Sequence, residues 1–133
     1  MKALSGFKVR SLPVGAEVPT CDNSGAKVVK IISVRGHKTV RRRIAAAGIG
    51  DLISASVIVG KPEMRKQVVL AVVVRQKKPY RRPNGMRIKF EDNAVIVLKD
   101  EKGNPKGTIF KGAIAKEAAE RWPAISKISS TVV

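Results

Sequence analysis

The sequence predicts a mainly β fold, either a small barrel or a sandwich, that forms one compact domain. Three observations lead to this class. Five short segments rich in Val and Ile are each bounded by Gly, Pro, Asn or Asp, which is typical of β-strands. A single helical pattern occurs, late in the chain. The 133 residues, 44% of them hydrophobic, are enough for one hydrophobic core.

The predicted strands occupy residues 26–35, 51–60, 67–75, 86–90 and 94–99. In the second strand, Ile53, Ala55 and Val57 alternate with serines, which is the period-2 pattern of a strand with one buried face. Residues 68–74 are instead apolar at every position. We expect this strand to be covered on both faces, by the sheet interior and by an element packed outside.

The helical pattern follows in residues 112–125. Apolar side chains recur at i, i+4, i+8 and i+11, namely Ile114, Ala118, Trp122 and Ile125. Glu117 is placed to pair with Arg121, and Pro123 ends the first helical segment. We expect this stripe to cover the core, with Trp122 as a packed core residue in preference to an anchor for a partner.

The charge of the chain is large and unevenly distributed. Lys and Arg number 27 against 10 acids, for a net charge of +17, which is typical of proteins that bind phosphate or anionic lipid. Residues 35–89 hold 15 of the cations and two acids, whereas residues 113–133 hold three cations and two acids. One part of the chain is therefore predicted to face an anion, and the C-terminal part is not.

Two loops carry the densest charge. In "KTVRRR", Lys38 and the arginines at 41–43 place four cations in six residues, and a guanidinium can grip phosphate with two hydrogen bonds. In "QKKPYRRPNG", residues 76–85, two prolines stiffen the backbone and Asn84-Gly85 supplies a turn. Tyr80 lies between the cation pairs, and either stacks on a nucleotide or packs on the prolines of its own loop.

Enzyme chemistry finds little support. His37 is the only histidine and Cys21 the only cysteine, so the chain lacks a metal-ligand pattern and an internal disulfide. Glu91 and Asp92 are neighbours whose side chains would diverge on an extended chain, so we expect turn formers or partners for arginines. No apolar window approaches a membrane span and no leader pattern is present. The prediction is a cytoplasmic, non-enzymatic protein without a cofactor.

The segment "AVVVRQKKPYRRPNGMRIKFEDNAVIVL", together with "DNSGA", "AGIGDLI" and "GTIFKGAIAKE", resembles the universal large-subunit ribosomal protein family numbered fourteen. "GKPEMRKQV" and "FEDN" resemble its archaeal and eukaryotic branch, leaning archaeal. The resemblance implies a five-stranded β-barrel over about residues 1–110, a projecting β-ribbon, and a C-terminal helical segment over about residues 113–133. It implies a structural constituent of the large subunit that binds large-subunit rRNA near the subunit interface.

The resemblance also implies partners. They are small-subunit rRNA at intersubunit bridges, the universal third and eukaryotic-type twenty-fourth ribosomal proteins, and the anti-association initiation factor six, with no membrane. The alternative function is a free-standing regulatory single-strand binder built on a small barrel, which would need an aromatic platform. The chain has only three Phe, one Tyr and one Trp.

Three sets of residues carry these expectations. The predicted rRNA contacts, mainly to phosphate and sugar, are Lys38, Arg41, Arg42, Arg43, Lys61, Arg65, Lys66, Lys77, Lys78, Tyr80, Arg81, Arg82 and Arg87. The predicted structural turn residues are Asp22, Asn23, Gly25, Asn84, Gly85 and Asn93. The predicted protein-partner residues, on the helix face opposite the apolar stripe, are Ala115, Ala119 and Glu120, with the tail of residues 126–133.

Overall fold

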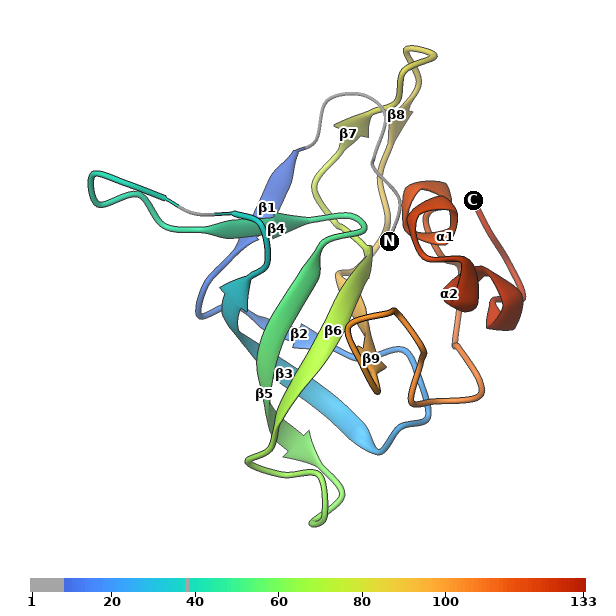
Figure 1. Ribbon diagram of the computed structural model, residues 1–133. Helices are drawn as coiled ribbons and strands as arrows, with labels where there is room; N and C mark the ends of the chain where they lie inside the picture. The colour runs from blue at the N-terminus through green and yellow to red at the C-terminus, as the bar shows by residue number, and fades with distance from the viewer. Residues whose placement is uncertain (1–8, 38) are drawn as a thin grey trace.

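The computed structural model of the protein describes residues 9–37 and 39–133. Strands dominate it, and two short helices follow them (Figure 1). The elements are β1 (Arg10–Pro13), β2 (Glu17–Pro19), β3 (Ala26–Val34), β4 (Ala46–Gly48), β5 (Leu52–Gly60), β6 (Val68–Arg75), β7 (Tyr80–Arg81), β8 (Arg87–Ile88), β9 (Ala94–Leu98), α1 (Lys116–Arg121) and α2 (Pro123–Ile128). The predicted mainly β class with C-terminal helices is confirmed.

The central sheet has five antiparallel strands in the order β2-β3-β5-β6-β9. It curls so that its two outermost strands meet beyond the end of β2, where Thr20 and Val95 form a parallel bridge. The Cys21 amide donates to the Val95 carbonyl at 3.1 Å. The sheet thus approaches a barrel, joined across its edges at this bridge rather than by a continuous ladder.

One strand of the predicted five lies elsewhere. The segment 86–90 does not enter the central sheet; its residues 87–88 form β8, which pairs with β7 in a separate two-stranded ribbon. The fifth strand of the sheet is β2, which is only three residues long and contains Pro19. Short length and a proline hide a strand from pattern analysis, yet both suit an edge strand.

The core has two layers that share the sheet. Ala71 and Val73 of β6 point into the curled interior, whereas Val72 and Val74 point to the helices. All four are fully buried, which confirms that β6 is covered on both faces. The interior layer is completed by residues such as Ile53 of β5, in the predicted alternation.

The helical segment closes the outer layer. Ile114, Ala118, Trp122 and Ile125 are all at most 1% exposed, as the periodicity predicted. The Trp122 indole Nε1 donates to the Gly50 carbonyl at 2.9 Å, so this tryptophan is a core residue. Pro123 separates α1 from α2 by occupying the first turn of α2, where its missing N–H is not needed. None of the helices in the described ranges is long and apolar enough to cross a membrane.

Candidate nucleic-acid interface

The arginine loop joins β3 to β4, and its described residues, 35–37 and 39–45, extend away from the sheet (Figure 1). Its base is closed by His37, whose Nδ1 lies 3.0 Å from the Ala46 carbonyl oxygen and 3.2 Å from the Ala46 amide nitrogen. At the tip the Thr39 hydroxyl donates to the Arg43 carbonyl at 2.7 Å. The three arginines at 41–43 are exposed, and among the described residues none of them forms an ion pair. Lys38, predicted to bind rRNA, lies outside the described residues.

The tip of this loop has an unusual backbone. Arg41 and Arg42 have φ angles of 57° and 64°, both in the left-handed region. Two successive residues of this kind match a type I′ turn, which prefers Asn and Gly. Side chains other than Gly, Asn and Asp pay about 1–2 kcal/mol each for this conformation. The sequence thus keeps two guanidinium groups at a position where the backbone favours other residues.

The ribbon, residues 76–90, projects from the sheet and carries β7 and β8 (Figure 1). Its tip is the predicted Asn-Gly turn: the Asn84 Oδ1 accepts from the Met86 amide at 3.0 Å, and Gly85 has φ +88°. At its base the Asn93 Oδ1 accepts from the Lys77 amide at 2.8 Å. The exposed cations of the ribbon are Lys77, Lys78, Arg81 and Arg87, which were predicted to contact rRNA, and Lys89, which was not.

Tyr80 and Arg82, predicted to contact rRNA, are instead bound within the protein, and Glu117 of α1 binds both. The Tyr80 hydroxyl donates to Glu117 Oε2 at 2.9 Å, and the Arg82 Nε donates to Glu117 Oε1 at 2.7 Å. Arg82 also donates to the Val133 carbonyl at 2.6 Å. Tyr80 is 6% exposed, so its ring cannot stack on a base. We call Tyr80, Arg82 and Glu117 the ribbon clamp.

Glu117 was expected to form an ion pair with Arg121 on the same helix, but in the structure it takes part in the clamp. Glu117 does not pair with Arg121; Arg121 instead lies 3.3 Å from Asp51 at the start of β5. Burial, and then the neighbouring Glu117 carboxylate, raise the pKa of Tyr80 to about 12. Burial opposes the charge of Arg82, but its hydrogen bonds to Glu117 and Tyr80 outweigh burial and raise its pKa. The phenol therefore stays a hydrogen-bond donor and the guanidinium stays charged.

A third cationic segment is the turn of residues 61–67 between β5 and β6. Lys61, Arg65 and Lys66 are exposed on it, and Met64 is buried beneath them. The Arg65 Nε donates to the Gly60 carbonyl at 3.3 Å, which leaves the outer edge of its guanidinium for a ligand. All three residues are among the predicted rRNA contacts.

The segment of residues 22–25 is fixed by long-range bonds more than by a local turn. Asp22 is buried, and its carboxylate accepts from the Val97 amide at 3.0 Å and the Ser24 hydroxyl at 2.9 Å. Burial raises its pKa, against these hydrogen bonds. The Asn23 Oδ1 accepts from the Thr108 amide at 2.8 Å. The contacts link this segment to β9 and to residues 107–109, about 85 positions away.

The predicted protein-partner face is wrong for two of its three residues. Ala115 is fully buried and Ala119 is 6% exposed, and the Ala115 amide donates to the Val74 carbonyl at 3.0 Å. The cause is that α1 has six residues and lies in a corner between β6 and the returning chain, where Ile114 and Val132 form a bridge. Only Glu120 of the three is exposed, beside Lys116. The small residues permit close packing inside the protein, not docking of a partner.

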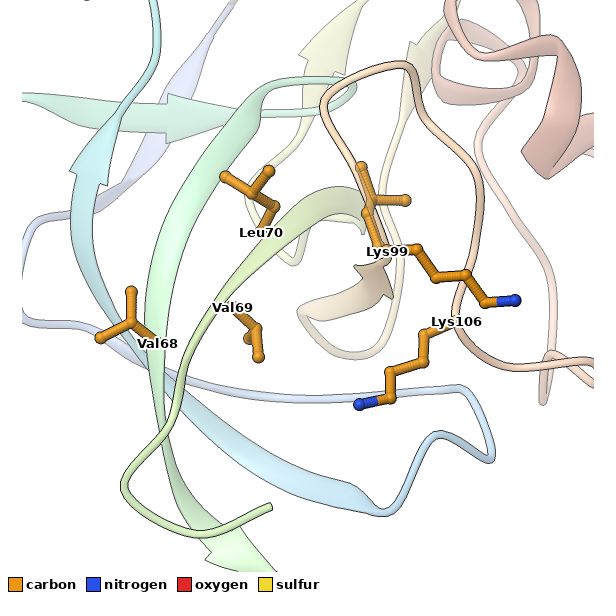
Figure 2. A pocket seen from close by; sticks show the side chains of 6 residues that line it. Val68, Val69, Leu70, Lys99 and Lys106 are labelled. Atoms are coloured by element: carbon orange, nitrogen blue, oxygen red, sulfur yellow. The ribbon is translucent and has the colours of Figure 1, made fainter. Parts of the chain in front are cut away.

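Two lysines that were not among the predicted rRNA contacts, Lys99 and Lys106, lie near the turn of residues 61–67. Residues 90–112 hold equal numbers of acids and cations. In space two of the four acids pair with arginines: Asp92 with Arg75 at 3.0 Å and Glu101 with Arg35 at 2.9 Å. Lys99 and Lys106 instead extend beside the apolar side chains of Val69 and Leu70, where they line a cleft of about 370 Å³ (Figure 2). A charge count along the chain cannot detect this separation.

Candidate metal ligands and the Cys21 thiol bear on the chemistry of this surface. No group of three or more His, Cys, Asp or Glu residues in the described ranges could hold a metal ion. Cys21 is buried, and burial raises its pKa to about 11, so it remains a protonated thiol. What the structure presents is three exposed cationic segments on a rigid sheet, an arrangement that fits a polyanion.

Comparison with known proteins agrees with this chemistry. Residues 11–133 match the model of the family described as "Ribosomal protein L14p/L23e". The chain is 59% identical over its full length to the large ribosomal subunit protein uL14 of Nanoarchaeum equitans. It is 53% identical to the uL14 protein of Picrophilus torridus and 49% identical to that of Thermoplasma volcanium. Each alignment covers the whole of both chains.

Proposed function

Because the chain belongs to the ribosomal protein L14p/L23e family, we propose that it is a structural constituent of the large ribosomal subunit that binds large-subunit rRNA. The predicted family is thereby confirmed, and archaeal relatives fit the predicted archaeal leaning. The observation that carries the proposal is the arginine loop, where three exposed arginines, which form no ion pair with any residue that the structure describes, project from the sheet.

The ribbon and the turn of residues 61–67 extend the proposed rRNA surface. Their exposed cations are Lys77, Lys78, Arg81, Arg87 and Lys89 on the ribbon and Lys61, Arg65 and Lys66 on the turn. Most such contacts go to phosphate and sugar, because a guanidinium or ammonium on a surface loop meets the backbone first. Arg82 contributes indirectly, since the clamp to Glu117 fixes the direction in which the ribbon projects.

The position near the subunit interface and the partners are part of the same proposal. They comprise bridges to small-subunit rRNA, contacts with the universal third and eukaryotic-type twenty-fourth ribosomal proteins, and the anti-association initiation factor six. Since Ala115 and Ala119 are buried, a protein partner would have to use the exposed Glu120 and the tail beyond α2, where Val132 and Val133 are nearly half exposed.

The alternative, a free-standing single-strand binder, needs aromatic rings on its surface. The rings that the structure describes have other roles, while Phe7 lies outside the described residues. Tyr80, Phe110 and Trp122 are buried, and Phe90 is partly buried against the outer core layer. Sedimentation of cell lysate separates the two functions, because a ribosomal constituent travels with large subunits and a free binder stays at the top of the gradient.

The salt dependence of rRNA binding tests the proposed surface. Binding of purified protein to large-subunit rRNA should weaken steeply with salt, by about 0.7–0.9 log units per log unit of salt for each phosphate neutralised. Changing Arg41, Arg42 and Arg43 together to Gln should reduce that slope by roughly 2. A variant with Lys30→Gln and Lys127→Gln, both exposed on other elements, is the control. A flat salt response of the unmodified protein would contradict the proposal.

A further inference from the structure

A second cleft, of about 470 Å³, opens beside the turn that connects β2 to β3. Its lining includes Thr20, Asn23 and Gly25 together with three lysines, Lys27, Lys61 and Lys111. Three segments distant in sequence thus contribute one lysine each. The volume lies within the range of small-ligand sites.

The lining of this cleft is rigid. The Asn23 side chain is bonded to Thr108 through both its oxygen and its nitrogen, at 2.8 and 3.1 Å. The Lys61 amide donates to the Gly25 carbonyl at 2.9 Å, and the Lys111 amide donates to the Cys21 carbonyl at 2.6 Å. The backbone that carries two of the lysines is therefore fixed before any ligand arrives, which lowers the entropy lost on binding.

The charge of the cleft is not neutralised from within. Lys27, Lys61 and Lys111 are exposed, and within the described ranges none of them forms an ion pair. The one acid in the lining, Asp22, is 8% exposed and its two carboxylate oxygens accept from Val97 and Ser24. Three ammonium groups therefore face the cleft against one carboxylate that is turned into the protein.

The cleft lies near the one shown in Figure 2. Met64 lies between them, since the Lys106 Nζ is 3.2 Å from its sulfur and its Cγ is 3.3 Å from the position a Cβ on Gly25 would take. Lys106 and Lys99 thereby extend the row of lysines along the end of β6. This end of the molecule lies opposite the ribbon (Figure 1).

We propose that the lysine cleft binds the phosphodiester backbone of RNA as a further contact, which adjoins the turn of residues 61–67 at Lys61 and is separate from the arginine loop and the ribbon. The inference rests on the proposed function and extends it to a part of the surface where no contact was predicted except at Lys61. Lysine ammonium groups act as point charges without the planar fork of arginine. The cleft should therefore hold phosphate without selecting bases, and the protein should join two RNA segments at opposite ends of its sheet.

The test compares Lys27→Gln with Lys111→Gln, as a double variant, against the control double variant Lys30→Gln with Lys127→Gln. Both remove two exposed positive charges, so any difference reports position rather than net charge. Thermal unfolding should be unchanged in both. Binding of large-subunit rRNA at 0.1 M salt should weaken roughly tenfold or more in the cleft variant, with a salt slope lower by about 1.4–1.8, and little in the control.

A direct probe of the cleft distinguishes failure of this inference from failure of the proposed function. Titration with inorganic phosphate, followed by amide NMR, should shift Asn23, Gly25 and Lys61 in the unmodified protein and not in the cleft variant. If unmodified protein binds rRNA and the arginine-loop variant weakens it, but the cleft variant equals its control and phosphate moves no cleft amide, only this inference falls. If the unmodified protein does not bind rRNA, the proposed function falls instead.

Discussion

The arginine loop and the ribbon have similar charge but are held in different ways. The loop closes on itself, through His37 at its base and Thr39 at its tip, and its arginines 41–43 are exposed and form no ion pair within the described part of the chain. The ribbon is fixed to α1 by the clamp of Tyr80, Arg82 and Glu117. One of its cations is thus used inside the protein.

This difference shows why cations on a loop cannot be counted as ligand contacts. The acid that engages Arg82 lies 35 positions later in the chain, so no local pattern reveals it. The Arg82 side chain is 13% exposed, whereas the neighbouring Arg81 is exposed. Adjacent arginines therefore have different roles: one orients the ribbon and the other is available to bind.

The largest expected effect on stability comes from disrupting the packing of α1, the helix that carries Glu117 of the clamp. Ala115→Arg places a long charged side chain at a fully buried position under α1, where both overpacking and an unpaired charge are costly. We expect it to lower the free energy of unfolding by about 3 kcal/mol or more, measured by urea unfolding with Trp122 fluorescence. Glu120→Arg, on the exposed side of the same helix, should change it by less than about 0.5 kcal/mol. Equal effects at the two positions would contradict the burial described here.

The features that the sequence could predict are those set by residues close together in the chain, and the features it missed depend on contacts between residues far apart in the chain. The alternation at Ile53 and the stripe from Ile114 to Ile125 are local patterns, and both were right. The strand β2 and the partner of Tyr80 depend on contacts that local pattern cannot encode. The error at Ala115 has the same origin, since a helical wheel shows one buried face but not the corner that buries a second.

The clamp can be tested with the only tyrosine of the chain. Absorbance titration should give a pKa for Tyr80 of about 12, above its ordinary value of 10.0. Because the folded protein holds this proton more tightly, the stabilisation is complete below pH 10 and is lost as the pH rises through about 12. Glu117→Gln removes the nearby negative charge and should lower the pKa.

The same substitution should also cost stability at neutral pH. Arg82 would lose its charged partner in a site where both side chains are mostly buried, at 13% and 20% exposure, so we expect a loss of about 1–2 kcal/mol. Glu120→Gln breaks the exposed pair with Lys116 and should cost less than about 0.5 kcal/mol. A Glu117 variant that leaves both the tyrosine titration and the stability unchanged would show that the clamp does not form in solution.

The smallest effect on stability is expected at the tip of the arginine loop, and its sign is the informative part. Arg41→Asn with Arg42→Gly installs the residue pair that a type I′ turn prefers, at the two positions where φ is 57° and 64°. Relief of this strain should raise the free energy of unfolding by about 1 kcal/mol. The loss of two guanidinium groups should at the same time weaken binding to large-subunit rRNA by roughly tenfold or more at 0.1 M salt.

Arg43→Gln is the matched control, because it removes a charge from the same tip at a residue without positive φ, and should weaken binding without raising stability. Opposite movement of the two measurements would mean that the tip keeps its strained arginines for binding, in contrast to Arg82, whose replacement should lower stability. A double variant that is less stable, or that binds rRNA as well as the unmodified protein, would remove the distinction between the two regions.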